Sequence, residues 1–146
     1  MAVYSHILLA LDFTAATDTV VKQALVLRQA LDARLSLVHV VEFIPVDLYN
    51  DLVMPQDFEI DRDLLQRATQ RLQERAATPG IDNSECFVRL GSTRREILDL
   101  AVEQHVDLIV IGSHGREGIQ RLLGSTANAV LHGAPCDVLA VRIKNE

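Results

Sequence analysis

Short apolar runs and amphipathic segments alternate along the whole chain, and this alternation limits the possible folds more than any other feature. The apolar runs are typical of strands covered on both faces, and we expect strands at residues 4–12, 34–42, 84–90, 106–112 and 136–143. The segments between them repeat apolar residues at spacings of three and four, which is typical of helices that pack by one face. We expect these helices at 15–31, 58–78, 93–106 and 125–133. Because strands separated by helices pair in parallel through right-handed crossovers, the sequence predicts an α/β fold: one open, doubly wound, five-stranded parallel sheet, Rossmann-like, with helices on both faces.

The size and charge of the chain narrow its possible partners. Its 146 residues suit one domain spanning 1–146. The formal net charge is −6, so we expect neither nucleic acid nor an anionic membrane as a partner. The N-terminus lacks a basic region and a cleavage site, and no run approaches the roughly 18 apolar residues of a membrane span. We therefore expect a soluble, cytoplasmic protein that binds any anion through local groups.

The cysteines and histidines show no spacing that indicates a disulfide framework or a zinc site. The chain has two cysteines, Cys86 and Cys136, without a CxxC motif or a zinc-like spacing. We expect both to be reduced residues in or near the core, and we name no metal ligands. His39 lies inside a predicted strand, where a core histidine with satisfied hydrogen bonds is favoured over a ligand.

Two connections carry specific expectations. Residues 43–57 contain two prolines and no clear period, so they form either a binding loop or a disordered insert. The helix at 93–106 is expected to open with a capping box between Thr93 and Glu96.

The predicted topology also locates a site. In doubly wound sheets, ligands bind outside the carboxyl ends of the strands, where the strand order reverses. The ends of the first and fourth predicted strands carry Asp12 and Gly112. Asp12 is interpreted as a ligand-binding or metal-binding carboxylate, or as a group that serves the start of the first helix.

The segment "DLIVIGSHGREGIQRLLGSTANAV" (107–130) has the chemistry of a phosphate cradle. Glycines allow backbone N–H groups to converge on an anion, and Ser125 and Thr126 begin the last predicted helix, whose positive end favours negative charge. The alternative is structural: Gly112 ends a strand and a hydroxyl caps a helix. Neither GxxxxGK[ST] nor GxGxxG is present.

Several motifs together resemble the universal stress protein family, over essentially the whole chain. They are "ILLALDF", "LVHVVE", "GSHGREG…LLGSTAN" and the closing "APCDVLAVR". The resemblance implies a fold like that of the adenine nucleotide alpha hydrolases. The family's nucleotide-binding branch carries a glycine, two residues, a glycine, about nine residues and then Gly-Ser or Gly-Thr. This chain has eight residues between Gly115 and Gly124, one fewer than that pattern.

The resemblance assigns roles to individual residues. It implies that Asp12 lies near the ribose or base and that backbone groups of Val40 meet the adenine edge. It further implies that Gly112 and Gly115 line the ribose and phosphates. The phosphates would be held by Gly124, Ser125 and Thr126, with a charge-assisted contact from His114 and Arg116.

The resemblance implies a small regulatory protein of the stress response that binds ATP or AMP and forms a homodimer through its last strand. Mg²⁺ or Mn²⁺ could accompany ATP, although no pair of carboxylates for a metal is visible. Two alternatives stay open: a slow ATP hydrolase, and a nucleotide-free dimeric adaptor whose glycine loop is structural. Because phosphoryl transfer needs charge neutralisation and a positioned nucleophile, and the loop offers no lysine or evident base, we name no catalytic residue.

Overall fold

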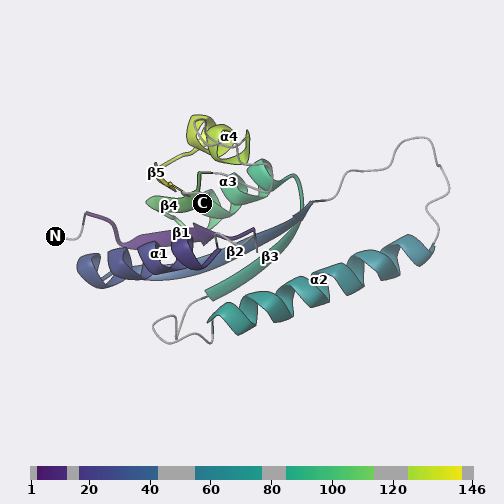
Figure 1. Ribbon diagram of the computed structural model, residues 1–146. Helices are drawn as coiled ribbons and strands as arrows, with labels where there is room; N and C mark the ends of the chain where they lie inside the picture. The colour runs from purple at the N-terminus through teal and green to yellow at the C-terminus, as the bar shows by residue number, and fades with distance from the viewer. Residues whose placement is uncertain (1–2, 13–16, 43–54, 77–84, 114–124, 143–146) are drawn as a thin grey trace.

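The structure is a computed structural model that describes residues 3–12, 17–42, 55–76, 85–113 and 125–142. Strands and helices alternate along these residues, as the sequence predicts (Figure 1). In chain order they are β1 (His6–Ala10), α1 (Thr17–Leu31), β2 (Arg34–Glu42), α2 (Pro55–Ala76), β3 (Glu85–Gly91), α3 (Thr93–Glu103), β4 (Leu108–Gly112), α4 (Ser125–Gly133) and β5 (Asp137–Val141).

The five strands form one parallel sheet in the order β3-β2-β1-β4-β5. The chain moves outward from β1 to β3 and then crosses back to place β4 on the other side of β1. Ala10 at the end of β1 is the register partner of Val38 in β2 and of Ile111 in β4. The reversal of strand order therefore lies between β1 and β4, and the predicted doubly wound α/β fold is confirmed.

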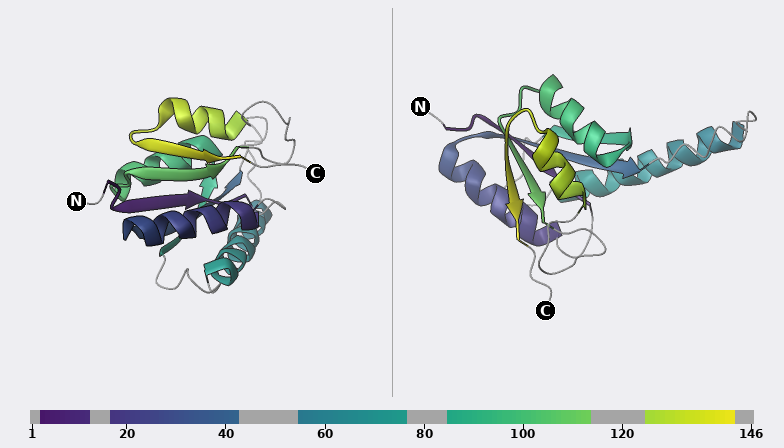
Figure 2. Two further views of the ribbon diagram at one scale, coloured as in Figure 1. Left: turned by 60° about the vertical axis from the view of Figure 1, so that its left-hand side comes forward. Right: turned by 90° about the horizontal axis from the view of Figure 1, so that it is seen from above.

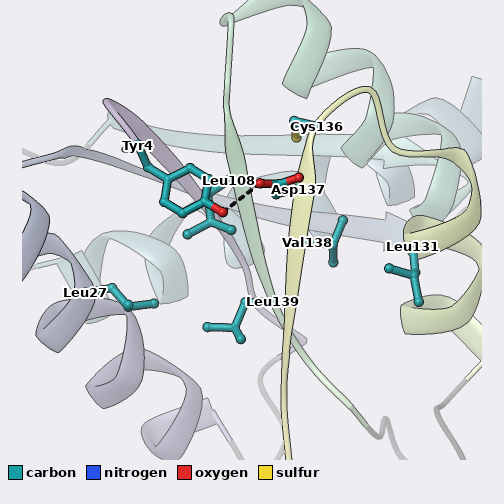
Figure 3. Close-up of a pocket in the computed structure, with 8 residues that line it drawn as sticks. All are labelled: Tyr4, Leu27, Leu108, Leu131, Cys136, Asp137, Val138 and Leu139. Atoms are coloured by element: carbon teal, nitrogen blue, oxygen red, sulfur yellow. Dashed lines mark hydrogen bonds between the residues drawn. The ribbon is translucent and has the colours of Figure 1, made fainter. Parts of the chain in front are cut away.

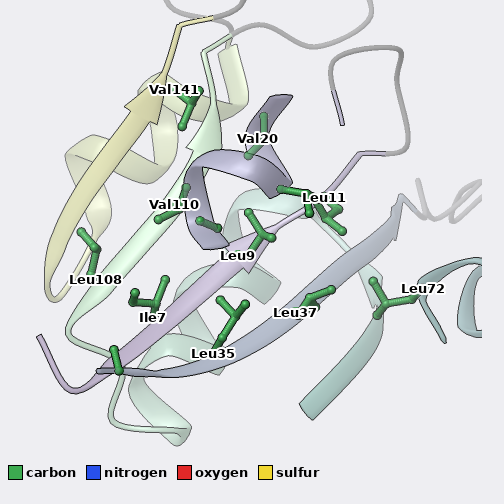
Figure 4. Packing of buried hydrophobic residues seen from close by; sticks show 13 residues of the cluster. Ile7, Leu9, Leu11, Val20, Leu35, Leu37, Leu72, Leu108, Val110 and Val141 are labelled. Atoms are coloured by element: carbon green, nitrogen blue, oxygen red, sulfur yellow. The ribbon is translucent and has the colours of Figure 1, made fainter. Parts of the chain in front are cut away.

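The sheet separates two apolar layers because successive side chains of a strand point to opposite faces. In one layer, Leu9 and Leu37 pack with residues of α1 and with Leu72 of α2 (Figure 4). In the other, Leu8 and Val38 pack with residues of α3 and α4. The sheet is thus covered on both faces, which explains the continuous apolar runs in its central strands.

Helix α3 ends in a compact left-handed turn. His105 has a φ of 55°. Its N–H donates to the carbonyl of Val102 (3.2 Å), and the N–H of Val106 donates to the carbonyl of Ala101 (2.9 Å), the pair of bonds that defines a Schellman motif. This turn explains why α3 ends at residue 103, whereas the predicted helix continues to 106. Helix α1 is followed by a similar residue, Asp32, with a φ of 50°.

The predicted capping box between Thr93 and Glu96 is wrong. The N-cap of α3 is Ser92, and its side chain makes no capping hydrogen bond. The hydroxyl of Thr93 instead donates to Oε1 of Glu42 at the end of β2 (2.8 Å). Because this bond joins the start of α3 to a neighbouring strand, the Thr93 hydroxyl serves tertiary structure and not its own helix.

Other boundaries differ from the predictions by a few residues. Helix α2 begins at Pro55, inside the connection predicted for 43–57. A proline is tolerated there because the first turn of a helix leaves its N–H groups unbonded. The strands predicted at 4–12, 106–112 and 136–143 are each shorter in the structure, whereas β2 and α4 match their predicted ranges. No helix among the described residues is both long and apolar enough to cross a membrane.

Candidate functional site

The candidate site is the edge of the sheet where β1, β2 and β4 end. In the left view of Figure 2 the arrowheads of the strands and the beginning of α4 lie on the same side of the molecule. Asp12 follows β1 by two residues, Val40 lies near the end of β2, and Gly112 ends β4. The structure therefore brings these three predicted site residues to one edge, at the reversal of strand order where doubly wound sheets bind ligands.

Backbone geometry directs the polar groups of Val40 toward the end of β1. The N–H of Leu11 donates to the carbonyl of Val38 (2.9 Å), so the backbone of Val38 faces β1. Because orientation alternates along a strand, Val40 presents its own N–H and carbonyl to the same side. The Val40 side chain is 7% exposed and packs in the layer beneath α3 and α4. Only its backbone can therefore meet a ligand, near the exposed Asp12.

The end of β4 is held firmly, and the helix that follows begins at the same edge. Gly112 is the register partner of Val141, and the N–H of the buried Ser113 donates to the carbonyl of Val141 (2.8 Å). Ser125 begins α4 and is exposed, and Thr126 is half-buried. The first turn of a helix has N–H groups without helical partners and carries a partial positive charge. The start of α4 can therefore bind an anion.

Helix α1 contributes a polar group that sequence reasoning missed. Thr17 at its first position is 2% exposed, and its hydroxyl has no hydrogen-bond partner among the residues that the structure describes. A buried hydroxyl of this kind is costly, and it lies where α1 begins after β1. The signal was present in the sequence, because Thr17 shares the buried stripe of the helix with Val20, Val21 and Ala24.

His39 is half-buried and hydrogen-bonded, which confirms its interpretation as a satisfied histidine. Its Nδ1 lies 2.6 Å from the carbonyl oxygen of Leu11. Burial lowers the pKa of His39 below its usual 6.5 and the positive charge of Arg71 lowers it further, against opposing effects of the Leu11 hydrogen bond and Asp12. The imidazole is therefore neutral at pH 7.

The cysteines have the character that the sequence predicts. Cys86 and Cys136 are both free and half-buried. Burial raises the pKa of each thiol, and the carboxylates of Asp107 and Asp137 add to the effect at Cys136. Both are therefore protonated at neutral pH. Within the described part of the chain, no three histidine, cysteine or acidic side chains are grouped to hold a metal ion.

Four of the predicted site residues, His114, Gly115, Arg116 and Gly124, lie outside the described residues. The central part of the predicted phosphate cradle therefore stays a prediction, and only its two ends are placed by the structure.

Comparisons with known proteins agree along the whole chain. The model of the universal stress protein family matches residues 4–142. The chain is 43% identical to universal stress protein A homolog 2 of Coxiella burnetii over 143 residues, covering 97% of each chain. The structure resembles that of universal stress protein UspA from Lactobacillus plantarum with a TM-score of 0.75 at 26% identity, covering 95% of this chain and 98% of the other. It also resembles a universal stress protein solved in complex with cAMP, with a TM-score of 0.63 at 24% identity, covering 94% and 96% of the two chains.

Proposed function

The chain belongs to the universal stress protein family, and from this premise we propose that it is a regulatory protein that binds an adenine nucleotide at the carboxyl edge of its sheet. The observation that carries the proposal is the meeting of three features at the β1/β4 reversal. These are the end of β1, the backbone of Val40 turned toward it, and the start of α4. Together they supply polar contacts for a base or ribose and a positive helix end for phosphate.

Different residues of the site are proposed to contact different parts of the nucleotide. We assign the phosphates to the first turn of α4, with the exposed Ser125 and the half-buried Thr126 adding hydroxyl donors. We assign the base and ribose to the backbone of Val40 and the carboxylate of Asp12. The Thr17 hydroxyl, which has no partner among the described residues, fits a polar ligand at this edge because a ligand atom could satisfy it. Gly112 ends β4 between these two groups.

The remaining residues of the site keep the roles that the resemblance implies. Gly115 and Gly124 would bring the backbone close to the ribose and phosphates, and His114 and Arg116 would add charge-assisted contacts. If the ligand is ATP, Mg²⁺ or Mn²⁺ could accompany it. We assign no protein ligands to the metal, so the phosphates themselves would hold it.

ATP and AMP are the nucleotides that we propose. The solved universal stress protein that binds cAMP shares the fold of this chain at 24% identity. The cAMP is a ligand of that protein, and for this reason cAMP is tested here beside ATP and AMP.

Equilibrium dialysis with labelled ATP, AMP and cAMP at neutral pH tests the proposal. We expect at least one of them to bind more tightly than 1 mM, a free energy near −4 kcal/mol. Mass spectrometry of the protein as purified from cells would show which nucleotide accompanies it. Binding no tighter than millimolar for all three would favour the nucleotide-free adaptor.

One substitution separates phosphate binding from folding. Ser125→Asp places a negative charge at the start of α4, where it is compatible with the helix dipole but repels phosphate. We expect nucleotide affinity to fall by at least about tenfold, because like charges at short range near a protein surface repel by several kcal/mol. Gln73→Glu adds the same charge at an exposed position of α2 and is the matched control. Equal affinities for the two variants would contradict the phosphate assignment.

We also propose that the protein forms a homodimer through β5. This strand lies at one end of the sheet and is exposed or partly exposed up to its last residue, Val141, which is buried. Beside it is an open hollow of about 480 Å³, whose lining includes Leu27, Leu131, Val138 and Leu139 (Figure 3). An apolar edge of this kind needs cover, and a second copy would provide it. Sedimentation equilibrium should show a dimer that Leu139→Glu dissociates; a wild-type monomer at micromolar concentration would contradict the proposal.

A further inference from the structure

We propose that His39 is a positioning residue of the nucleotide site: by donating a hydrogen bond to the carbonyl of Leu11, its imidazole fixes the peptide that carries Asp12. This inference rests on the nucleotide-binding function proposed above. It goes beyond that function by giving a role at the site to a side chain that does not itself face the ligand.

The first step of the argument is where β1 leaves the sheet. The ladder between β1 and β2 pairs Ala10 with Val38, and the N–H of Leu11 extends it by one bond to the carbonyl of Val38. Asp12 follows immediately and is exposed. Its position therefore depends on what holds the peptide group between Leu11 and Asp12.

The second step is that His39 holds that peptide from the neighbouring strand. The distance from His39 Nδ1 to the Leu11 carbonyl oxygen is 2.6 Å, which is a short hydrogen bond. A carbonyl oxygen can only accept, so the proton is on Nδ1 of the ring. The carbonyl and the N–H of the Leu11 residue are thus both bonded to β2, one to a side chain and one to the backbone.

The third step concerns the two faces of β2. Leu35 and Leu37 pack in the layer of α1 and α2, whereas Val38 and Val40 pack in the layer of α3 and α4. By alternation, His39 lies on the side of α1 and α2. Consecutive residues of one strand therefore serve the same site from opposite faces: Val40 offers its backbone, and His39 holds the neighbouring strand end.

Burial of the imidazole favours the neutral donor, and the two charges near it act in opposite directions. Among the described residues, charges that act on His39 come from Arg71 of α2, which lowers its pKa, and from Asp12 at the end of β1, which raises it. Burial and Arg71 lower the pKa of His39, so the neutral ring with a proton on Nδ1 is the form present at pH 7. Protonation would leave that donor in place but would add a positive charge beside Asp12.

Two variants separate the hydrogen bond from the ring. In His39→Asn the amide nitrogen occupies the position of Nδ1 and keeps a donor without a titrating charge. In His39→Leu the donor is lost at similar bulk. We expect His39→Leu to weaken ATP or AMP binding at pH 8 by about five- to tenfold, the effect of one lost hydrogen bond. Affinity in His39→Asn should stay within about twofold of the wild type.

Nuclear magnetic resonance of the unliganded protein gives a readout that does not depend on nucleotide. The amide resonance of Asp12 should move in His39→Leu and stay close to its wild-type position in His39→Asn. In the wild type, ¹⁵N shifts of the His39 ring should show the Nδ1-protonated tautomer, a measurement that needs no variant to fold.

The possible failures can be told apart. If the wild type binds no adenine nucleotide, the proposed function and the positioning role both fall. If the wild type binds but the ring carries its proton on Nε2, or the two variants lose affinity equally, the role of His39 alone is overturned. An unchanged affinity in His39→Leu has the same consequence.

Discussion

The two edges of the sheet, where the strands begin and where they end, are built differently. At the beginning of the strands, Asp107 accepts hydrogen bonds from the backbone N–H of Ser5 (2.8 Å), from its hydroxyl (2.9 Å) and from the N–H of His6 (2.9 Å). The buried His6 ring lies 3.0 Å from the carbonyl of Gln104 and 2.7 Å from the hydroxyl of Ser36. Polar groups at this edge are paired within the protein.

At the opposite edge two exposed polar residues are found: Asp12 just after the end of β1, and Ser125 at the start of α4. This edge also holds the buried Thr17 hydroxyl, which lacks a partner among the described residues. The comparison teaches that the polar side chains of one edge tie its strands together, whereas those of the other edge lie at the position of the proposed ligand. Substitutions at the first edge should therefore change folding and not binding.

The largest effect on folding is expected from Asp107→Ala. The substitution removes the acceptor of three hydrogen bonds, two of them from the backbone N–H groups of Ser5 and His6. The free energy of unfolding should therefore fall by about 2–3 kcal/mol. Urea denaturation measures this, with Asp63→Ala at an exposed position of α2 as the control. Nucleotide affinity, measured where the variant is folded, should stay the same. A binding defect in folded Asp107→Ala would remove the distinction between the two edges.

A smaller effect is expected from the titration of His6. Burial lowers the pKa of His6 below its ordinary 6.5 and Arg34 lowers it further, against the Gln104 carbonyl and Asp107. The unfolded chain thus binds a proton more readily than the folded chain. The stabilising contribution of neutral His6 is fully present above pH 6.5 and is lost as the pH falls below that value.

Urea denaturation between pH 5 and pH 8 tests this dependence. The decline of the unfolding free energy on acidification should be shallower in His6→Gln than in the wild type. His132→Gln, at an exposed position of α4, is the matched control. Identical slopes for the wild type and His6→Gln would show that the ring does not couple protons to folding.

The sequence was sufficient for the fold and for the places of Asp12 and Gly112 within it, because both depend on local periodicity and on strand order. The apolar runs predicted each strand, and Asp12 and Gly112 were placed correctly at the β1/β4 reversal. The individual polar contacts could not be predicted in the same way. Asp107 and Ser5 are 102 positions apart, and only the completed sheet brings them together.

The sequence also could not predict which of two possible hydrogen-bond partners a side chain takes. Thr93 has a local partner in its own helix and a distant one in Glu42, and tertiary packing selects the distant one. His39 could be recognised as a satisfied core residue, but its bond to Leu11 depends on where β1 leaves the sheet. The phosphate cradle stays a prediction, because its central residues lie outside the described part of the chain.

A modest gain in stability is expected from His105→Gly. His105 has a φ of 55°, a region that strains residues with a Cβ atom and suits glycine at the end of a helix. Relief of this strain, reduced by the greater entropy of an unfolded glycine, should raise the unfolding free energy by about 0.5 kcal/mol. Val102→Gly, at an exposed position inside the same helix, should lower it. A loss of stability in His105→Gly would mean that its side chain contributes more than the turn geometry.

The smallest effect is expected from Thr93→Val, which removes a side-chain hydrogen bond at the edge where the strands end. The Thr93 hydroxyl donates to the exposed carboxylate of Glu42, and water can replace both partners. Because the net value of such a bond is small, the unfolding free energy should fall by less than about 0.5 kcal/mol. Comparison with Asp107→Ala in the same urea series is the sharpest test of the contrast between the edges. A loss in Thr93→Val as large as that in Asp107→Ala would show that the edge where the strands end is also stabilised by its own polar contacts.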